Sequence, residues 1–526
     1  MLRSYWLWIV LACTLLGGCA SLPPGADFPR TPSQALAHPE QTRLGAQAQA
    51  SAAAHPGQSG FRLLSAGADG FLVRMQMIHA AAKTIDMQYF IFHGDDTGQL
   101  LTGAVLQAAA RGVRVRILVD DGETAAGDEQ IALLAAHPMV ELRVFNPFRY
   151  RGHINMIRAA EFMLDFARLD HRMHNKLIVV DNAVALIGGR NIGDQYFQID
   201  PDGQFADDDL FSTGPVVKDM SASFDQFWAS PKAIPVQALA GGLASFVELD
   251  EHRQHLRQLK QERKDEAKSY VTRIASGEPL AGVLSGQLPL IWANARLVGD
   301  RPDKPSAPQE GDRGPALMHG AVVEASAAAQ SELLMVTPYL IPGREGMRIF
   351  DALRQRKVRV RILTSSLISS TVLLAQSGYM HYRVPLLKLG VELYEVRAQL
   401  GNTRGSGQTQ AISSFGNYAL HAKLFVFDRK QVLIGSMNFD QRSLHLNTEV
   451  GLLIDSPVLA QQIASRFEAM VQAENAYALN LDPSGALEWR TREGGKELST
   501  TREPARSGWQ RFSVNVLALL PLDDEL

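Results

Sequence analysis

The stretch His174-Asn-Lys-Leu-Ile-Val-Val-Asp181 decides how this chain folds, because it recurs as His421-Ala-Lys-Leu-Phe-Val-Phe-Asp428. Each copy is followed by glycine and asparagine at matching positions, in Gly188-Gly-Arg-Asn191 and Gly435-Ser-Met-Asn438. The apolar, partly β-branched run after each lysine predicts a strand. One such pair alone would indicate a solvated surface strand. Two matching copies instead indicate one active site that is built from two halves.

The duplication extends well beyond this stretch. Val113-Arg-Val-Arg-Ile-Leu118 recurs letter for letter as Val358-Arg-Val-Arg-Ile-Leu363, an offset of 245 residues (358 − 113), and the histidines are offset by 247 (421 − 174). Such constant spacing predicts tandem copies of one domain instead of a short repeat array. In each copy a strand-like run, a helical stretch and the Val-Arg-Val-Arg-Ile-Leu strand follow in that order, which predicts a largely parallel sheet covered by helices. We therefore expect two layered α/β domains related by pseudo-twofold symmetry, with the catalytic strands at their interface.

The paired motif resembles the signature of the phospholipase D superfamily over nearly all of the chain past its first residues. The resemblance implies the catalytic residues His174, Lys176, Asp181, His421, Lys423 and Asp428. It implies that His174 attacks phosphorus and that His421 serves as acid and base, although the symmetry of the motifs leaves this order open. The lysines and the phosphate-binding residues Asn191, Asn438 and Ser436 would stabilise the transition state. The first copy has Gly189 where the second keeps Ser436, so it lacks one hydroxyl donor.

The motif aspartates Asp181 and Asp428 begin the turns after the catalytic strands, so we expect them to fix local structure. By the same resemblance, a carboxylate about thirty residues past each histidine orients the imidazole. Glu449 fits this position in the second copy, and Asp207 fits it in the first, with Asp209 as the alternative. The spacing of Asp170, His171 and His174 matches no common zinc pattern, and two lysines can neutralise the phosphoryl oxygens. We expect neither a metal nor a cofactor.

Within the superfamily the chain is most similar to bacterial cardiolipin synthases of the type C branch. The stretches that carry this are Asp86–Phe92, Thr337–Pro342, Ser377–Arg383 and Trp509–Phe512. The resemblance implies phosphatidyl transfer to phosphatidylglycerol, with phosphatidylglycerol or phosphatidylethanolamine as donor, and a small macrodomain protein as a possible partner. The apolar stretches 368–374 and 509–520 either pack in the core or enter a membrane interface.

The N-terminus predicts an exported lipoprotein. Arg3 precedes the apolar run 5–16, which is too short for a confident membrane span and typical of a signal peptide. Leu16-Gly-Gly-Cys19 resembles a bacterial lipobox, and Ala20 after the cysteine favours the outer membrane over the inner one. Cys13 is the only other cysteine, so the mature protein can form no disulfide. We expect a periplasm-facing enzyme that is held in the cell envelope by lipidated Cys19.

The expected organisation follows from these landmarks. It comprises a signal peptide (1–18), a lipidated cysteine with a flexible tether (19–60), the first domain (61–250), a charged helical or loop connector (251–315) and the second domain with a C-terminal segment (316–526). The segment 401–416, rich in Gly and Ser, predicts a loop bordering the substrate site.

Composition separates the remaining alternatives. The chain has 526 residues, a formal net charge of −3 and 20% charged residues, so nothing in its composition marks a nucleic-acid binder. The alternatives are a phospholipase D that uses water as acceptor, a periplasmic nuclease of the same superfamily and an inactive membrane-bound scaffold. The intact His, Lys and Asn of both copies argue against the scaffold, and the lipid anchor and neutral charge argue against the nuclease.

Overall fold

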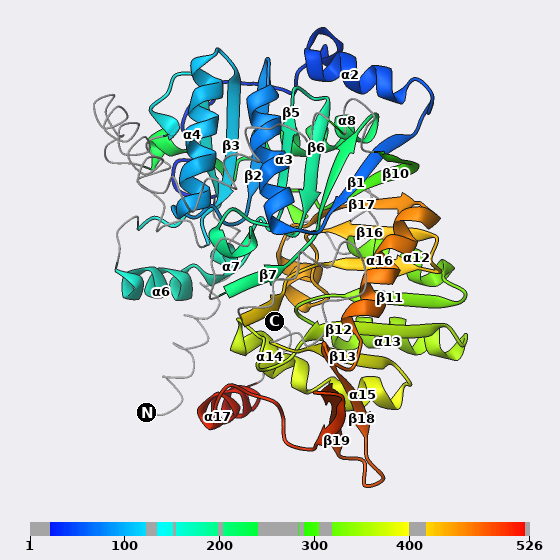
Figure 1. Ribbon diagram of the computed structural model, residues 1–526. Coiled ribbons are helices and arrows are strands. Elements are labelled where there is room, and N and C mark those ends of the chain that lie inside the picture. The colour runs from blue at the N-terminus through cyan, green and yellow to red at the C-terminus, as the bar shows by residue number, and fades with distance from the viewer. Residues whose placement is uncertain are drawn as a thin grey trace, which may run out of the picture.

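The computed structural model describes residues 22–122, 134–150, 154–197, 203–239, 282, 289–304, 318–398 and 417–520. It contains two α/β halves, one above the other in Figure 1, as the duplication predicts. The predicted signal peptide, Cys19, the charged segment 251–268 and the loop 401–416 lie outside the described residues. Within the described part of the chain, no helix is both long and apolar enough to cross a membrane.

The first half is built on a mixed sheet with the strand order β9-β4-β3-β2-β5-β6-β8-β1. Strands β2, β3 and β4 are parallel, whereas the histidine-bearing motif enters β5, which runs antiparallel to β2. The strands are β1 (Ser59–Leu64), β2 (Thr84–Tyr89), β3 (Arg114–Asp120), β4 (Val140–Phe145), β5 (Leu177–Val180), β6 (Val184–Gly188), β8 (Asp209–Thr213) and β9 (Ala233–Pro235).

The second half repeats this order as β18-β13-β12-β11-β15-β16-β17-β10. Its strands are β10 (Ile291–Gly299), β11 (Glu332–Val336), β12 (Arg359–Ser365), β13 (Glu392–Val396), β15 (Leu424–Phe427), β16 (Gln431–Gly435), β17 (Val450–Asp455) and β18 (Ala476–Leu481), and β19 (Leu487–Glu493) and β20 (Lys496–Thr500) extend it. Because β1 pairs antiparallel with β10, the two sheets join edge to edge, as a twofold relation between them requires.

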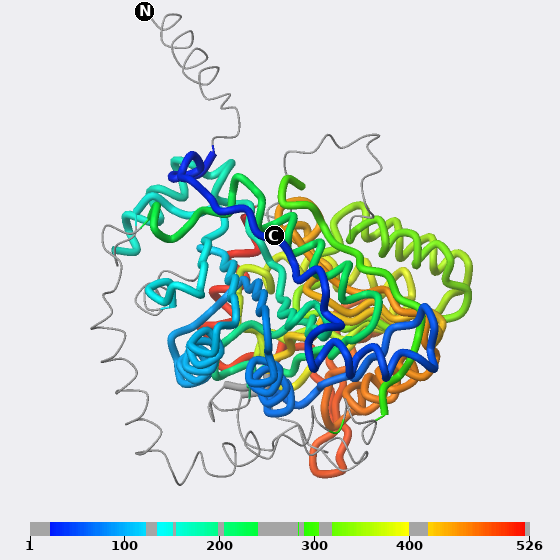
Figure 2. The backbone as a smooth tube through the Cα atoms, turned by 90° about the horizontal axis from the view of Figure 1, so that it is seen from above, coloured from blue at the N-terminus to red at the C-terminus, as the bar shows by residue number. Residues whose placement is uncertain are grey.

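Helices cover both faces of each sheet. In the first half α3 (Gly67–Ala80) and α4 (Asp96–Ala110) lie along one face, where Figure 2 shows them in blue, and α8 (Val216–Ala229) packs on the other. The counterparts in the second half are α12 (Met318–Ala328), α13 (Gly343–Gln355) and α16 (Pro457–Met470). One core cluster contains side chains from α8 and α16 together with strands of both sheets, so the two halves share a core.

The repeated Val-Arg-Val-Arg-Ile-Leu strands carry a buried arginine in each half. Arg116 on β3 binds both carboxylate oxygens of Asp86, at 2.6 and 2.8 Å, and lies over the Phe224 ring of α8. Arg361 on β12 binds both carboxylate oxygens of Glu468 on α16, at 2.6 and 2.9 Å. A charge inside an otherwise apolar strand is tolerated here because each guanidinium has a bidentate partner.

The expectation of a free tether before the first domain is wrong for the part that is described. The helix α2 (Arg43–Ala52) buries Leu44 and Ala48. The segment before α2 is held through its backbone, since Arg116 donates to the Ser33 carbonyl at 2.9 Å and Arg114 to the Gln34 carbonyl at 2.6 Å. An apolar pattern could not reveal how the segment before α2 is held, because its main-chain carbonyls accept hydrogen bonds from arginines.

The predicted connector also contains a strand. Residues 291–299 were expected to belong to the connector, but they form β10 and pair with both β1 and β17. The strand therefore completes the second sheet. Many side chains of β10 are half-exposed, and its sequence lacks the continuous apolar run of a central strand. The sequence pattern therefore did not predict this strand.

Candidate active site

The two halves meet through backbone pairing immediately before each catalytic strand. The short strand β14 (Asn417–Leu420), which leads to His421, pairs in parallel with β7 (Gly203–Ala206) of the first half. On the other side of the interface a parallel bridge joins Met173 to Thr448. The amide of His421 donates to the Ala206 carbonyl at 2.8 Å, and that of His174 donates to the Thr448 carbonyl at 3.0 Å. Each histidine is thereby fixed against the segment that carries the acid of the opposite half.

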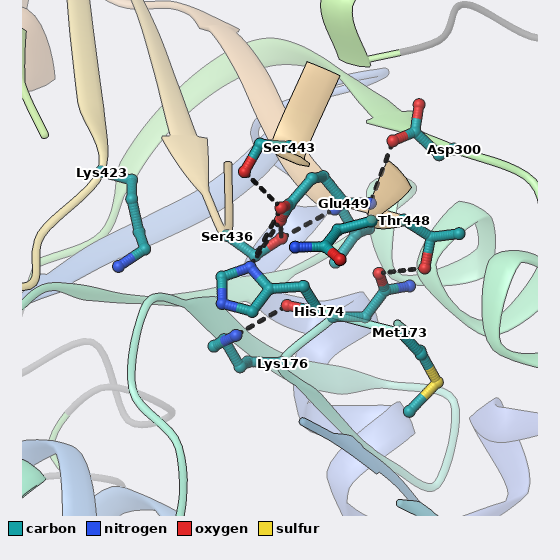
Figure 3. Close-up of polar contacts among 12 residues, drawn as sticks. Met173, His174, Lys176, Asp300, Lys423, Ser436, Ser443, Thr448 and Glu449 are labelled. Carbon is teal, nitrogen blue, oxygen red and sulfur yellow. Dashed lines mark hydrogen bonds and ion pairs between the residues drawn. The ribbon is translucent and has the colours of Figure 1, made fainter. Parts of the chain in front are cut away.

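His174 contacts Glu449, which comes from the second half. Its Nδ1 lies 3.0 Å from both carboxylate oxygens of Glu449. Ser436 Oγ donates to one of these oxygens, and Ser443 Oγ donates to the other at 2.8 Å (Figure 3). The Glu449 amide donates in turn to Asp300 at 3.0 Å. This carboxylate is fixed on every side, so it holds the ring of His174 in one orientation.

His421 has the reciprocal arrangement with Asp207 of the first half. Its Nδ1 lies 2.6 Å from Asp207 Oδ2. A β-carbon added at Gly189 would come within 2.2 Å of an Asp207 carboxylate oxygen, so the carboxylate fills the space of the missing side chain. Gly189 is therefore not simply a lost donor. One half pairs glutamate with Ser436, and the other pairs aspartate with glycine.

The two acids proposed from the sequence thus contact imidazoles, but each contacts the imidazole of the other copy. The position of each acid about thirty residues past a histidine implied that the acid orients the histidine of its own copy. That implication is wrong. The physical reason is the parallel pairing of β7 with β14 and of Met173 with Thr448, which crosses the domain interface. Both imidazoles therefore depend on both domains.

The site is a buried cluster of six ionisable groups. The Lys176 ammonium donates to the His174 carbonyl at 2.7 Å, and the Lys423 ammonium donates to that of His421 at 2.5 Å. Burial, together with the two lysines, lowers the pKa of both imidazoles well below the usual value. Both rings are therefore neutral near pH 7, and a neutral imidazole is the nucleophilic form.

Burial has the opposite effect on the two carboxylates. It raises the pKa of Glu449 and that of Asp207 to about 7, against the opposing pull of Lys176 and Lys423, respectively. Burial also lowers the pKa of Lys423 to about 8 and that of Lys176 well below its usual value. Such opposed shifts in one cluster are typical of a catalytic centre.

Aromatic rings form the walls around the imidazoles. Phe90, directly after β2, lies edge-on to His174 with ring centroids 5.0 Å apart. Phe205 and Tyr196 lie 5.1 and 5.2 Å from the ring of His421. These walls limit the access of water to both rings and contribute to the desolvation described above.

The motif aspartates lie at the other end of the catalytic strands and touch neither imidazole. The Asp181 carboxylate accepts hydrogen bonds from the amides of Ala82, Lys83 and Thr84. Although burial opposes it, the corresponding bonds from the segment 330–332 lower the pKa of Asp428. Their inclusion among the catalytic residues is corrected accordingly, because these carboxylates fix the turn after each strand, as expected from the turn position itself.

The predicted phosphate ligands behave differently from one another. Asn191 uses its amide within the fold, since it donates to the Tyr196 hydroxyl at 2.9 Å and accepts from the Ile91 amide at 3.1 Å. The Ser436 hydroxyl donates to Glu449, which corrects its assignment as a phosphate ligand. Asn438 is buried, and its side-chain oxygen has no hydrogen-bond partner among the described residues. This free atom is an acceptor, so it can bind a hydroxyl group of a ligand but cannot donate to a phosphate oxygen.

Removing the Ser436 hydroxyl should change the pH dependence of the enzyme. Its hydrogen bond lowers the pKa of Glu449, so Ser436→Ala should raise that pKa and move the acidic limb of kcat/KM to higher pH by about one unit. The measurement is a pH–rate profile of both proteins. The control is Ser369→Ala, at a buried serine whose hydroxyl bonds, among the described residues, to Ser366. An acidic limb unchanged in Ser436→Ala would contradict the assignment.

Asp209, the alternative acid of the first half, belongs to a separate ion cluster. It binds Arg74 at 2.6 and 3.0 Å and Arg190 at 3.1 Å, and all three side chains are buried. Asp209→Ala would leave two buried guanidinium groups without this partner, which should lower the free energy of unfolding by about 3–5 kcal/mol. Urea denaturation measures this loss. A loss no larger than that of the exposed control Asp219→Ala would contradict the structural role.

Asp170 and His171 connect the two halves. Arg442 donates to the Asp170 carboxylate at 2.7 Å, and the His171 ring contacts the Leu446 carbonyl at 3.3 Å. Nowhere in the described ranges do three or more His, Cys, Asp or Glu side chains come together as metal ligands.

Sequence reasoning missed several residues that shape the site. Ser443, Phe90 and Phe205 contact the catalytic groups directly, yet none belongs to the repeated motif. Phe205 had a usable signal, because it lies two residues before Asp207. Ser443 had none, since its contact with Glu449 depends on the path of the turn between β16 and β17.

Comparison with known proteins agrees with this geometry. Residues 75–228 and 322–471 match the family described as "Cardiolipin synthase, PLD-like domain", once in each half. The chain is 36% identical to cardiolipin synthase C of Escherichia coli K12, over 89% of this chain and 96% of that protein. It is 23% identical to cardiolipin synthase A of Edwardsiella ictaluri, over 82% of this chain and 71% of that protein. Phosphatidylserine synthase of Haemophilus influenzae shares the fold, with a TM-score of 0.54 at 14% identity over 82% and 92% of the two chains.

Proposed function

Since the chain belongs to the phospholipase D-like family of cardiolipin synthases and is a phosphatidyltransferase, we propose that it makes cardiolipin from phosphatidylglycerol and a second phospholipid. The donor is phosphatidylethanolamine or a second phosphatidylglycerol. The observation that carries the proposal is the pair of buried imidazoles, each with a carboxylate on Nδ1 from the opposite half. With Nδ1 occupied, Nε2 of each ring is left for phosphorus or for a proton.

The first step displaces the donor's head group. The neutral His174 attacks the phosphodiester through Nε2, a nitrogen–phosphorus bond forms, and the bond to the head-group alcohol breaks. The protonated His421 gives its proton to the departing alkoxide. In the second step His421 takes a proton from the hydroxyl of phosphatidylglycerol, whose oxygen then displaces His174 and releases cardiolipin.

The charges of the cluster account for the protonation of His421. With neutral imidazoles, the ammonium groups of Lys176 and Lys423 balance the carboxylates of Asp207 and Glu449. A bound phosphodiester adds one negative charge, and so favours uptake of one proton by a His–carboxylate pair. The lysines then face the phosphoryl oxygens and stabilise their charge. Symmetry alone does not distinguish the nucleophile, so His174 is assigned by resemblance to the family.

Product analysis tests this function. Purified protein in phosphatidylglycerol vesicles, with and without phosphatidylethanolamine labelled in its head group, should form cardiolipin detected by mass spectrometry. Released glycerol or labelled ethanolamine identifies the donor. Phosphatidic acid as the only lipid product would mean hydrolysis. No lipid turnover at all would refute the proposal and favour a nuclease.

We also propose that the enzyme faces the periplasm and is anchored by lipidated Cys19, with the outer membrane favoured. The lipobox-like Leu16-Gly-Gly-Cys19 supports this. We also propose a small macrodomain protein as a partner, and the resemblance to the family is the sole support for it. Labelling with a fatty acid should mark the wild type and spare Cys19→Ser.

A further inference from the structure

Two helices of this protein turn their apolar faces to solvent. On α17 (Gly508–Leu517) and the residues after it, the exposed apolar side chains follow helical spacing, with Trp509 73% and Leu519 83% exposed. Trp509 and Phe512 stack on one another at 5.3 Å. The members of this apolar stripe are Trp509, Phe512, Val516, Leu519 and Leu520.

The side of α17 that faces the protein is held by polar contacts and buries one apolar side chain, Val514, whereas the larger apolar side chains face outward. Gln510 donates to the Leu367 carbonyl at 2.9 Å, and the neighbouring Arg506 donates to the Ile368 carbonyl at 2.8 Å. A surface helix of a water-soluble body has the opposite orientation. Of the stretch 509–520, Val514 is buried, but the exposed apolar stripe is not covered by the described residues and needs another partner.

The helix α6 (Asn155–Leu164) in the first half is inverted in the same way. Glu161 on its polar side accepts hydrogen bonds from the amides of Arg149 and Tyr150, and Arg158 donates to the Asp121 carbonyl at 2.8 Å. Its outward side chains include Met163 at 75% and Leu164 at 89% exposure. The exposed apolar residues of this segment are Ile154, Met156, Ile157, Met163, Leu164 and Phe166.

Both helices are tied to the edge of the sheets that carries the catalytic histidines. His174 lies beside the carboxyl end of β2, and α6 follows the carboxyl end of the parallel strand β4. The carbonyls of Leu367 and Ile368, which hold α17, come directly after β12. Figure 1 shows α6 and α17 on the same side of the molecule, with α6 beside β7 of the active site and α17 below them.

We propose that α6 and α17 together form a docking surface for a phospholipid bilayer, which presents lipids to the shared active site. A bilayer fits because the apolar stripes stand beside arginines: Arg502 and Arg506 are exposed near α17, and Arg149 is exposed near α6. Apolar side chains can enter the acyl region while guanidinium groups bind anionic head groups. The inference rests on the proposed function in taking bilayer lipids as substrates.

Trp509 supplies a direct test of insertion. The full-length protein is mixed with phosphatidylglycerol vesicles whose acyl chains carry bromine, and the Trp509→Phe variant is subtracted to isolate this indole among six tryptophans. Because only insertion brings the indole to the brominated chains, this signal does not depend on whether Cys19 is lipidated. Quenching of the Trp509 signal is the expected result. A Trp509 signal that vesicles leave unquenched would overturn the proposal and assign the stripe to a protein partner.

Kinetics separate docking from chemistry. Trp509→Ser with Phe512→Ser, and separately Met163→Ser with Leu164→Ser, should lower turnover of vesicle lipids about tenfold or more. Both pairs should leave turnover of dispersed short-chain phosphatidylglycerol unchanged. The control pair, Val323→Ser with Val458→Ser, removes exposed valines from α12 and α16 at the far side in Figure 1.

Vesicle turnover equal to that of the control pair would contradict the docking surface. If the wild type turns over neither substrate, the proposed function fails, while quenching of Trp509 still decides the docking surface on its own. If a serine pair also loses turnover of the short-chain lipid, its fold is damaged and the quenching result again decides.

Discussion

His174→Ala and His421→Ala are each expected to lower phosphatidyl transfer by at least about 10³-fold. Either substitution removes a group that no neighbour can replace, because the lysines at the site donate to main-chain carbonyls and the carboxylates are held by fixed donors. The measurement is cardiolipin formation in phosphatidylglycerol vesicles.

The fold of both variants should stay intact, because the two imidazoles make polar contacts within the site and belong to none of the hydrophobic core clusters. Circular dichroism and thermal unfolding check this. His79→Ala is the matched control, because its ring hydrogen-bonds to the Met75 carbonyl on α3, away from the active site, in the part of the chain that the structure describes. Retained transfer in either His174→Ala or His421→Ala would refute the two-histidine mechanism.

The crossed pairing of acids and imidazoles gives the second large effect. Glu449→Gln and Asp207→Asn should each lower transfer by about 10²- to 10⁴-fold, because the amide neither fixes the tautomer of the ring nor stabilises its protonated form. Glu395→Gln is the control. Glu395 is a buried carboxylate that bonds to Trp489 and pairs with Arg383, away from the histidines. Its replacement should reduce stability and leave the rate of transfer nearly unchanged.

A donor with an activated leaving group tests which acid serves which ring. Phosphatidyl-p-nitrophenol needs no proton on its leaving group, so its first step does not require the acid. Asp207→Asn and His421→Ala should therefore recover nitrophenol release, whereas Glu449→Gln and His174→Ala should not. Recovery in His421→Ala and Glu449→Gln, with none in Asp207→Asn, would mean that each acid serves the histidine of its own copy.

The sequence was sufficient for the fold class and for most of the catalytic cluster. The repeated His-x-Lys stretches and the repeated Val-Arg-Val-Arg-Ile-Leu strands predicted two layered α/β domains, and the fold and the family comparison confirm them. The expectation of a largely parallel sheet is wrong, because each sheet has three parallel strands and its other described pairings are antiparallel. Asp207 and Glu449 could be located because each lies just before a strand that follows its motif, Asp207 two residues before β8 and Glu449 one residue before β17. The positions of the two acids can be predicted from local spacing, because that spacing is set by strands that follow one another in the chain.

Other features could not be predicted, because they depend on contacts between distant segments. The crossing of the acids arises from β7 and β14, whose partners lie more than 200 residues apart. The segment before α2 is structured because its main-chain carbonyls accept hydrogen bonds from arginines on β3. The outward face of α6 was missed as well, since an amphipathic pattern does not state which side faces the protein.

Covalent capture of the intermediate tests the central claim most directly. His421→Ala mixed with phosphatidyl-p-nitrophenol should release one equivalent of nitrophenol in a burst and then stall, because no base remains to activate the acceptor. Mass spectrometry of the digested protein should place the phosphatidyl group on His174, and His174→Ala should show neither burst nor adduct. A burst without an adduct on His174, or an adduct on a different residue, would contradict the mechanism proposed for this site.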